Sequence, residues 1–269
     1  MAYLAVEGDR QVYYERYNAG HGRPIMLVHG WGMSVRVWDS VLPALLANGN
    51  EIVSFDHRCC GSSDKDFDDV SIDVLAGDAV RLATHLDLQG VVVNGWSLGG
   101  AVAVAAAAGL GPRAAGVVST CGATPRYVQG DGWEHGGTTE VVEQTIAALR
   151  AGRPGFLHAL AEGVCHVDVG APAVEWMWRI FMQASPKADE SLLDLGRIDQ
   201  RDVVRSLQIP AMVMRGDHDA IVDPEIGAQC ARMFPNGRLV AFTESGHAPF
   251  LEEQEKYCAE FFGFLKTLG

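Results

Sequence analysis

The chain alternates between two patterns of hydrophobic and polar positions. Short, nearly continuous apolar runs, which are typical of strands buried on both faces, occupy residues 24–28, 51–56, 90–94, 114–119, 211–214 and 239–242. Apolar residues recur at helical spacing over residues 35–47, 72–86, 98–108, 224–234 and 250–268. Strands that alternate with helices predict parallel crossovers, and therefore an α/β fold with a mostly parallel central sheet flanked by helices.

Two stretches depart from this alternation. Residues 1–20 alternate polar and apolar positions and break at Asn18-Ala19-Gly20, which is typical of an antiparallel hairpin. Residues 125–207 lack strand patterns and show helical ones instead. These helical patterns lie near residues 139–150, 155–163 and 172–183. We therefore expect residues 1–124 and 208–269 to form one core domain, with a helical insertion between two of its strands.

Composition limits the class of protein and of partner. Of 269 residues, 48% are hydrophobic and 20% are charged, which matches a folded globular protein and excludes a wholly disordered chain. Asp and Glu number 34 against 21 Lys and Arg, so the net charge is −13. Such a surface repels phosphate backbones and anionic membranes, which makes nucleic acids and membrane surfaces poor partners.

The first residues and the cysteines indicate a compartment. The chain starts without a basic segment or an apolar stretch of signal length, and its longest run of small apolar residues, 101–110, is about half of what a membrane span needs. The six cysteines show no zinc-site spacing, and Cys59 and Cys60 are adjacent, which is poor disulfide geometry. We expect a soluble cytoplasmic protein with free thiols and with no metal or organic cofactor.

The motif most indicative of chemistry is Asn94-Gly95-Trp96-Ser97-Leu98-Gly99-Gly100, between a predicted strand and a predicted helix. Gly95 and Gly99 allow a very sharp turn that would expose Ser97 at the N-terminus of the helix, where N–H groups and the helix dipole favour negative charge. A serine hydroxyl becomes a nucleophile only when it is exposed and a base removes its proton. The alternative is an ordinary glycine-rich turn, but the strand before and the helix after favour a nucleophile.

The base and its orienting acid are expected after later strands, because hydrolases with such a nucleophile turn follow the order Ser…Asp…His along the chain. His247, in the loop after the last predicted strand, is the candidate general base. The loop after the preceding strand offers three carboxylates, Asp217, Asp219 and Asp223. Asp217 could bond the backbone of its own turn, and Asp223 precedes a proline as a helix N-cap would. The residues alone leave the choice of acid open.

Two backbone N–H groups are candidates for an oxyanion hole. Leu98 follows the candidate nucleophile, and Trp31 lies in a His-Gly-Trp-Gly sequence at the end of another buried strand. That Gly-x-Gly spacing could also begin a dinucleotide-binding fingerprint, but the fingerprint needs a third glycine where Val35 stands. Trp31 and Trp96 are in addition candidates for contact with a substrate.

Together these motifs resemble the α/β-hydrolase superfamily, in particular its esterase, lactonase and cofactor-free perhydrolase branch. The resemblance runs from about residue 24 to the C-terminus apart from the helical insertion, which corresponds to the lid that shapes the acyl pocket in that family. The family places its acid at the fourth position of a G-x-x-D loop, which implies Asp219 in Gly216-Asp217-His218-Asp219. Residues 56–64 look like the family's D-x-R-G-x-G-x-S loop, with Cys59 in place of the usual glycine.

The resemblance implies a serine hydrolase with Ser97 as nucleophile, His247 as general base and Asp219 as acid. We expect it to cleave a small to medium carboxylic ester through an acyl-serine intermediate. A serine at position 97 argues against the related haloalkane dehalogenases and epoxide hydrolases, which use aspartate there. The alternatives are a lactonase or enol-lactonase, a carbon–carbon bond hydrolase, and, in another class, a hydrolase-fold receptor with slow turnover.

Overall fold

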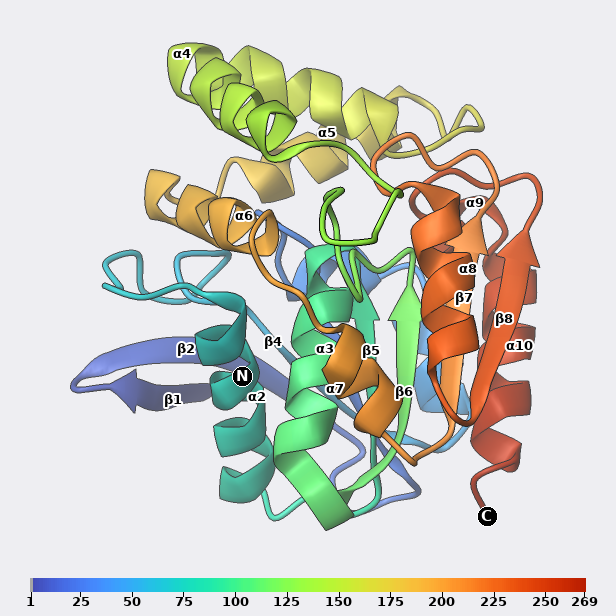
Figure 1. Ribbon diagram of the computed structural model, residues 1–269. Coiled ribbons are helices and arrows are strands. Elements are labelled where there is room, and N and C mark those ends of the chain that lie inside the picture. Colours follow the sequence, from blue (N-terminus) through green and yellow to red (C-terminus); the bar gives the residue numbers. More distant parts are fainter. Residues whose placement is uncertain (1) are drawn as a thin grey trace.

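One eight-stranded sheet organises residues 2–269, the part of the chain that the computed structural model describes (Figure 1). Its strands are β1 (Ala2–Glu7), β2 (Arg10–Tyr17), β3 (Pro24–Val28), β4 (Glu51–Phe55), β5 (Val91–Trp96), β6 (Ala114–Thr120), β7 (Ala211–Gly216) and β8 (Gly237–Phe242). They lie in the order β1-β2-β4-β3-β5-β6-β7-β8. The pairs β1–β2 and β2–β4 are antiparallel and all later pairs are parallel, which confirms the predicted hairpin and the mostly parallel sheet.

Helices cover both faces of this sheet. They are α1 (Leu42–Ala47), α2 (Ile72–His85), α3 (Leu98–Leu110), α8 (Pro224–Met233), α9 (Pro249–Glu252) and α10 (Gln254–Lys266). In Figure 1, α2, α3 and α8 lie in front of the sheet and α10 lies behind it. Every residue of β3, β4 and β5 is buried, as strands covered on two faces must be. No helix within residues 2–269 is long and apolar enough to cross a membrane.

Residues 125–207, called the helical segment below, connect β6 to β7. Their α-helices are α4 (Thr139–Gly163), α5 (Ala171–Phe181), α6 (Asp189–Leu195) and α7 (Arg201–Ser206). Figure 1 shows α4, α5 and α6 beyond the ends toward which the parallel strands point. α5 is amphipathic, and it buries Met177, Ile180 and Phe181 on its apolar side. The loops at the carboxyl ends of the parallel strands therefore lie beneath the helical segment.

The helical segment agrees with its prediction in one part and differs in another. The patterns at 139–150 and 155–163 are the two helical parts of α4, which a kink separates at Gly152, where the backbone leaves helical geometry just ahead of Pro154. Proline removes a backbone donor and clashes with the preceding turn, which accounts for the kink. The sequence did not predict α6 and α7. They contain seven and six residues, which is too short for helical periodicity to show.

Two helices predicted as continuous are interrupted. The pattern over 35–47 is a 3₁₀ helix at Val35–Trp38 followed by α1, which starts anew with Pro43 in its first turn. Proline is favoured there because its missing N–H would have no helical partner in any case. The pattern over 250–268 divides at Glu253, whose φ of −127° and ψ of 52° are not helical. The prediction of one terminal helix was therefore wrong, and α9 is a separate turn.

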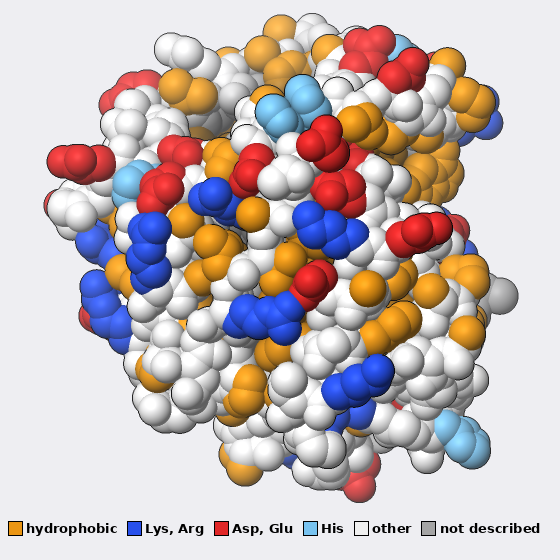
Figure 2. Space-filling model, turned by 90° about the vertical axis from the view of Figure 1, so that its right-hand side faces the viewer, with side chains coloured by type: hydrophobic (Ala, Val, Ile, Leu, Met, Phe, Trp, Pro, Cys, Tyr) orange, Lys and Arg blue, Asp and Glu red, His pale blue; other side chains and the backbone are white. Residues whose placement is uncertain are grey.

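The free edge of the sheet at β8 is blocked by charged side chains. Arg238 on β8 forms an ion pair with Glu260 of α10, and Lys256 Nζ donates to the Ala241 carbonyl at 2.8 Å. Figure 2 views this side of the molecule and shows acidic, basic and hydrophobic side chains interspersed. Charged side chains of this kind discourage edge-to-edge pairing with another sheet.

The cysteines of the chain are all free thiols, and every one except Cys165 is buried. Cys59 has a φ of 67°, in the left-handed region that favours glycine. The family motif that residues 56–64 resemble has a glycine at this position, and a glycine would adopt this φ without strain. Cys59 adopts the same backbone conformation in its place. Asp56 closes this loop by accepting the Ser62 N–H at 2.6 Å and the Val35 N–H at 2.7 Å.

Candidate active site

Ser97 lies in a sharp turn between β5 and α3, with a φ of 58°. A Cβ atom on Gly95 would lie 1.9 Å from the Gly99 carbonyl oxygen, and one on Gly99 would lie 2.4 Å from the Val28 carbonyl oxygen. Real Cβ atoms never approach so closely, so the turn requires glycine at both positions. The strained backbone at Ser97 holds its side chain at the carboxyl end of the sheet, beneath the helical segment.

Asp219 and His247 form a buried hydrogen-bonded pair. Nδ1 of His247 lies 2.7 Å from Oδ2 of Asp219, and each side chain is only 2% exposed. A carboxylate only accepts, so Nδ1 carries the proton and Nε2 is left as a base. The other carboxylate oxygen accepts the N–H groups of Ile221 and Val222, both at 2.9 Å. These bonds fix Asp219 while it orients the imidazole.

The other two candidate acids lie elsewhere. Arg215 donates to Asp217 at 3.1 Å, on the surface of the same loop. Asp223 is the N-cap of α8 and accepts the Glu225 N–H at 2.9 Å, as its position before a proline suggested. Of the three carboxylates that the sequence left open, the structure brings only Asp219 to His247.

Trp96 holds the backbone of the histidine. Its Nε1 donates to the His247 carbonyl at 2.7 Å, and the two rings lie 5.3 Å apart. Trp96 is 2% exposed, so most of its ring packs in the core, although its edge reaches the cavity described next. Trp96, which the sequence predicts as a substrate contact, therefore also has a structural role, because it positions the backbone of His247.

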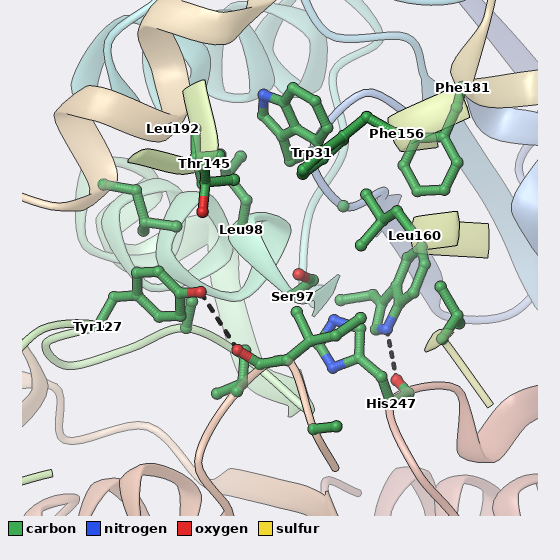
Figure 3. Close-up of a pocket in the computed structure, with 18 residues that line it drawn as sticks. Trp31, Ser97, Leu98, Tyr127, Thr145, Phe156, Leu160, Phe181, Leu192 and His247 are labelled. Carbon is green, nitrogen blue, oxygen red and sulfur yellow. Dashed lines mark hydrogen bonds between the residues drawn. The ribbon is translucent and has the colours of Figure 1, made fainter. Parts of the chain in front are cut away.

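Ser97 and His247 line one cavity of about 190 Å³ between the sheet and the helical segment (Figure 3). Its walls are mainly aromatic and aliphatic, and they include Gly30, Trp31, Trp96, Leu98, Ala123, Tyr127, Thr145, Phe156, Leu160, Val164, Phe181, Leu192, Leu195, Ala220, Ile221 and Val222. No Asp, Glu, Lys or Arg of residues 2–269 is among them. The hydroxyls of Tyr127 and Thr145 already donate to the carbonyls of Ile221 and Val141. The cavity suits an uncharged ligand.

The Ser97 hydroxyl is not hydrogen-bonded to the candidate base. Within residues 2–269 no hydrogen bond joins Ser97 Oγ to His247. Both side chains nevertheless border the same cavity, and Figure 3 shows both among its lining residues. The structure thus brings all three predicted side chains to one place and joins two of them directly.

The two predicted oxyanion donors come from adjacent segments. Leu98 is the first residue of α3, where helical N–H groups have no partner within the helix. No acceptor among residues 2–269 takes the N–H of Trp31. A Cβ atom on Gly30 would lie 3.1 Å from the Ser97 Cβ, which shows how closely the loop before Trp31 approaches the serine. Both N–H groups are therefore available beside Ser97.

His29 shapes the loop that carries Trp31. Its Nδ1 donates to the Gly30 carbonyl at 2.7 Å, and its Nε2 accepts the His57 N–H at 2.9 Å. Full burial holds the pKa of His29 well below its ordinary value, so the ring is neutral. Both ring nitrogens are engaged with the backbone, so His29 shapes the loop and offers no second base.

Cys121 lies against the Asp219–His247 pair. Ligand atoms of these three residues lie within 4.8 Å of one another, and they form the one such group found among residues 2–269. Burial, together with the carboxylate of Asp219, raises the pKa of the Cys121 thiol well above its ordinary value. A metal ion here would need a thiolate and would displace the Asp219–His247 hydrogen bond, so the donor set fits an acid–base pair better than a metal site.

The sequence did not identify the cavity wall contributed by the helical segment. Tyr127, Thr145, Phe156, Phe181 and Leu192 all line the cavity, but they are separated by many residues and come from a loop and from the helices α4, α5 and α6. The amphipathic pattern of α5 could have indicated Phe181, because that residue lies on the apolar side of the helix. The other positions depend on how the helices pack.

Comparison with known proteins finds relatives over nearly the whole chain. A sequence model described as the alpha/beta hydrolase fold matches residues 23–254. The chain is 28% identical to a non-heme haloperoxidase of Rhodococcus erythropolis and 24% identical to the bifunctional esterase/perhydrolase DCH of Acinetobacter calcoaceticus, each over 99% of this chain and 100% of the relative. A solved structure of an esterase from Exiguobacterium antarcticum has the same fold, with a TM-score of 0.94 at 24% identity over 98% of both chains.

Proposed function

Because the chain belongs to the alpha/beta hydrolase fold family, we propose that it is a serine hydrolase of small to medium, uncharged carboxylic esters. The observation that carries the proposal is the buried Asp219–His247 pair, which borders the same apolar cavity as Ser97. The names of the curated relatives, a bifunctional esterase/perhydrolase and a haloperoxidase, support catalytic chemistry in this fold.

In the proposed reaction Ser97 Oγ attacks the ester carbonyl carbon while His247 Nε2 takes its proton. The tetrahedral intermediate collapses when the imidazolium returns the proton to the leaving alcohol, which departs and leaves an acyl-Ser97 ester. Water then attacks the acyl carbon and gives a proton to His247. The second tetrahedral intermediate collapses when the imidazolium returns this proton to Ser97 Oγ, which releases the carboxylic acid and restores free Ser97. Asp219 holds the Nδ1–H tautomer and stabilises the charged ring in both halves.

The free structure is compatible with this mechanism although Ser97 and His247 are not hydrogen-bonded. Nucleophile–base hydrogen bonds are often long in free enzymes and tighten when substrate binds. The N–H groups of Trp31 and Leu98 are the proposed oxyanion hole. Each such donor contributes about 3–4 kcal/mol to the stabilisation of the transition state.

We assign the helical segment, residues 125–207, as a lid over a core formed by residues 1–124 and 208–269. Support comes from its position beyond the carboxyl ends of the strands and from Phe156, Leu160 and Phe181, which it contributes to the cavity. In this arrangement the lid selects the acyl group, and the core supplies the reacting side chains.

The cavity favours a particular class of substrate. Its volume of about 190 Å³ and its uncharged wall suit a short aliphatic or aromatic acyl group. A charged group buried there would lose its hydration without gaining a partner, which costs several kcal/mol. Neutral lactones meet the same requirement, so lactonase activity remains within the proposed class.

A perhydrolase activity is the second candidate, and the relative named as a bifunctional esterase/perhydrolase favours it. In that reaction hydrogen peroxide replaces water as the attacker of acyl-Ser97. His247 takes the peroxide proton and passes it to the leaving Ser97 Oγ, so the products are a peracid and free Ser97. A carbon–carbon bond hydrolase is less favoured, because it would need lid groups that protonate the substrate, and the hydroxyls of Tyr127 and Thr145 already donate elsewhere.

The decisive experiment is steady-state turnover of a panel of p-nitrophenyl esters of graded acyl length, beside labelling by a fluorophosphonate that reacts with activated serines. We expect continuous turnover, labelling of Ser97, and a loss of about 10⁵–10⁶-fold in turnover in Ser97→Ala. A single stoichiometric burst without further turnover would instead favour the slow receptor. Peracid formation from hydrogen peroxide and a short carboxylic acid distinguishes the perhydrolase.

A further inference from the structure

Glu252, the last residue of α9, accepts four backbone N–H groups from two distant parts of the chain. Its Oε1 accepts from Gly246 at 2.9 Å and its Oε2 from Ala248 at 3.0 Å. Oε1 also accepts from His166 at 2.5 Å and from Val167 at 3.2 Å. The first two donors flank the candidate base, and the other two follow α4 in the helical segment.

The two segments that Glu252 joins also touch each other directly. The N–H of His247 itself donates to the Val164 carbonyl at 2.8 Å. A Cβ atom on Gly246 would lie 2.7 Å from the His166 nitrogen and 3.2 Å from the Val164 carbonyl oxygen. The close approach therefore requires glycine before the histidine. The loop of the base is packed on the end of α4, and Glu252 links the two on one side.

The position of Glu252 is fixed by its own helix. Two residues earlier, Phe250 is completely buried, and its ring lies 5.1 Å from that of Trp38 and 5.2 Å from that of Trp96. The carboxylate is thus an anchored acceptor and not a mobile surface group.

We propose that Glu252 is a positioning residue, which clamps the loop of His247 to the end of α4 and so fixes the base relative to the helical segment. The inference rests on the proposed function, because it gives Glu252 a role in catalysis only if His247 is the base. Hydrogen bonds to an ionised acceptor are roughly twice as strong as neutral ones. A displacement of about 1 Å at a reacting group can cost about 100-fold in rate, so the clamp affects kcat without touching the substrate.

The test is Glu252→Gln, which keeps the size of the side chain but turns one acceptor oxygen into an NH₂ donor facing backbone N–H groups. We expect kcat to fall about 10–100-fold, with KM within about twofold, because Glu252 does not line the cavity. Amide hydrogen exchange at Gly246, Ala248, His166 and Val167 should accelerate.

Glu253→Gln is the matched control. Glu253 accepts from the Ser245 hydroxyl at 2.7 Å and from the Glu244 N–H at 3.1 Å, so it anchors the same loop further from His247. If Glu252 only stabilised the loop, both variants would lower Tm and kcat alike. The inference requires that Glu253→Gln keep kcat within about twofold of the unaltered protein, and equal losses in the two variants would overturn it.

Two further arms keep the outcome unambiguous. The rate at which the fluorophosphonate labels Ser97 can be measured without an ester. It therefore reports the effect of Glu252 on His247 even if the protein does not cleave the proposed class of ester. Labelling of the unaltered protein without ester turnover would overturn the proposed function, whereas labelling of Glu252→Gln at the unaltered rate would overturn the clamp alone. If Glu252→Gln does not fold, Glu252→Asp keeps the charge but is one methylene shorter, and it should show the same selective loss of kcat.

Discussion

The indole nitrogen of Trp31 donates a 3.1 Å hydrogen bond to the carbonyl oxygen of Ala188. Ala188 belongs to the helical segment, whereas the backbone N–H of Trp31 is a proposed oxyanion donor. The Trp31 ring also lies 6.2 Å from that of Phe181 on α5. A single side chain therefore links the proposed lid to the loop beside Ser97.

Trp31→Phe tests this link, because it keeps an aromatic ring and removes the N–H donor. We expect a loss of about 1 kcal/mol in the free energy of unfolding, because one hydrogen bond is removed. We also expect a fall of about 10-fold in kcat/KM, because the loop that carries the backbone N–H of residue 31 is held less firmly beside Ser97. Trp178→Phe is the control, because it loses a similar 3.0 Å bond to the Pro154 carbonyl away from the cavity. Equal losses of activity in the two variants would contradict the expectation.

Asp219→Asn should lower kcat about 10⁴-fold, because an asparagine leaves the imidazole in the wrong tautomer. The comparison variant is Asp223→Asn, which alters the N-cap of α8 and should change stability by about 1 kcal/mol or less while activity stays near that of the unaltered protein. Both are measured with one activated ester and by thermal unfolding. Greater damage from Asp223→Asn would mean that the acid has been assigned to the wrong residue.

The uncharged cavity predicts discrimination by charge. Methyl butyrate and monomethyl succinate have acyl chains of similar length, but the second carries a carboxylate. Burial of that carboxylate without a partner costs several kcal/mol, so kcat/KM for the half-ester should be at least about 100-fold lower. Comparable values for the two esters would place the acyl group outside the cavity.

Acid pH should destabilise the fold through two neighbouring buried histidines. The rings of His29 and His57 lie 4.1 Å apart. Burial lowers the pKa of His57 to about 4 and that of His29 well below its ordinary value. Both rings stay neutral when folded, whereas the unfolded chain takes up their protons near pH 6.5, so stability falls as the pH drops from about 7 to about 4.

Asp56 opposes this trend, because burial raises its pKa to about 6. Its contribution to stability is present at low pH and is lost as the pH rises from about 4 to about 6. Two histidines outweigh one carboxyl group, so we expect these three groups together to make the fold less stable at pH 4.5 than at pH 7. Urea unfolding at the two pH values measures it. His57→Gln should flatten the dependence, and a greater stability at pH 4.5 would refute the assignment.

The sequence alone predicted the parts of the protein that local chemistry determines. The turn at Ser97 was predictable because only glycine fits at positions 95 and 99. Asp219 could not be chosen from its own loop by residue type, since Asp217 and Asp223 lie nearby. The resemblance to a family selected it, and the 2.7 Å bond to His247 agrees. Its catalytic role remains a prediction.

What the sequence could not predict depends on distant packing. In the sequence, Glu252 looks like any other glutamate of a predicted helix. Its hydrogen-bond partners His166 and Val167 lie more than 80 positions earlier in the chain. The walls of the cavity come from side chains on separate helices, so no spacing along the sequence indicates them. The break at Glu253 was likewise hidden, because the apolar spacing of α9 continues into that of α10.

The uncharged wall around Ser97 has a consequence for the end of the proposed catalytic cycle. Ester cleavage turns a neutral acyl group into an anion, and among residues 2–269 the wall contains no Lys or Arg to retain it. The net charge of −13 repels that anion further. Departure of the acid is therefore favoured by the charge that the reaction itself creates, and accumulated acid should be a poor inhibitor of the next turnover.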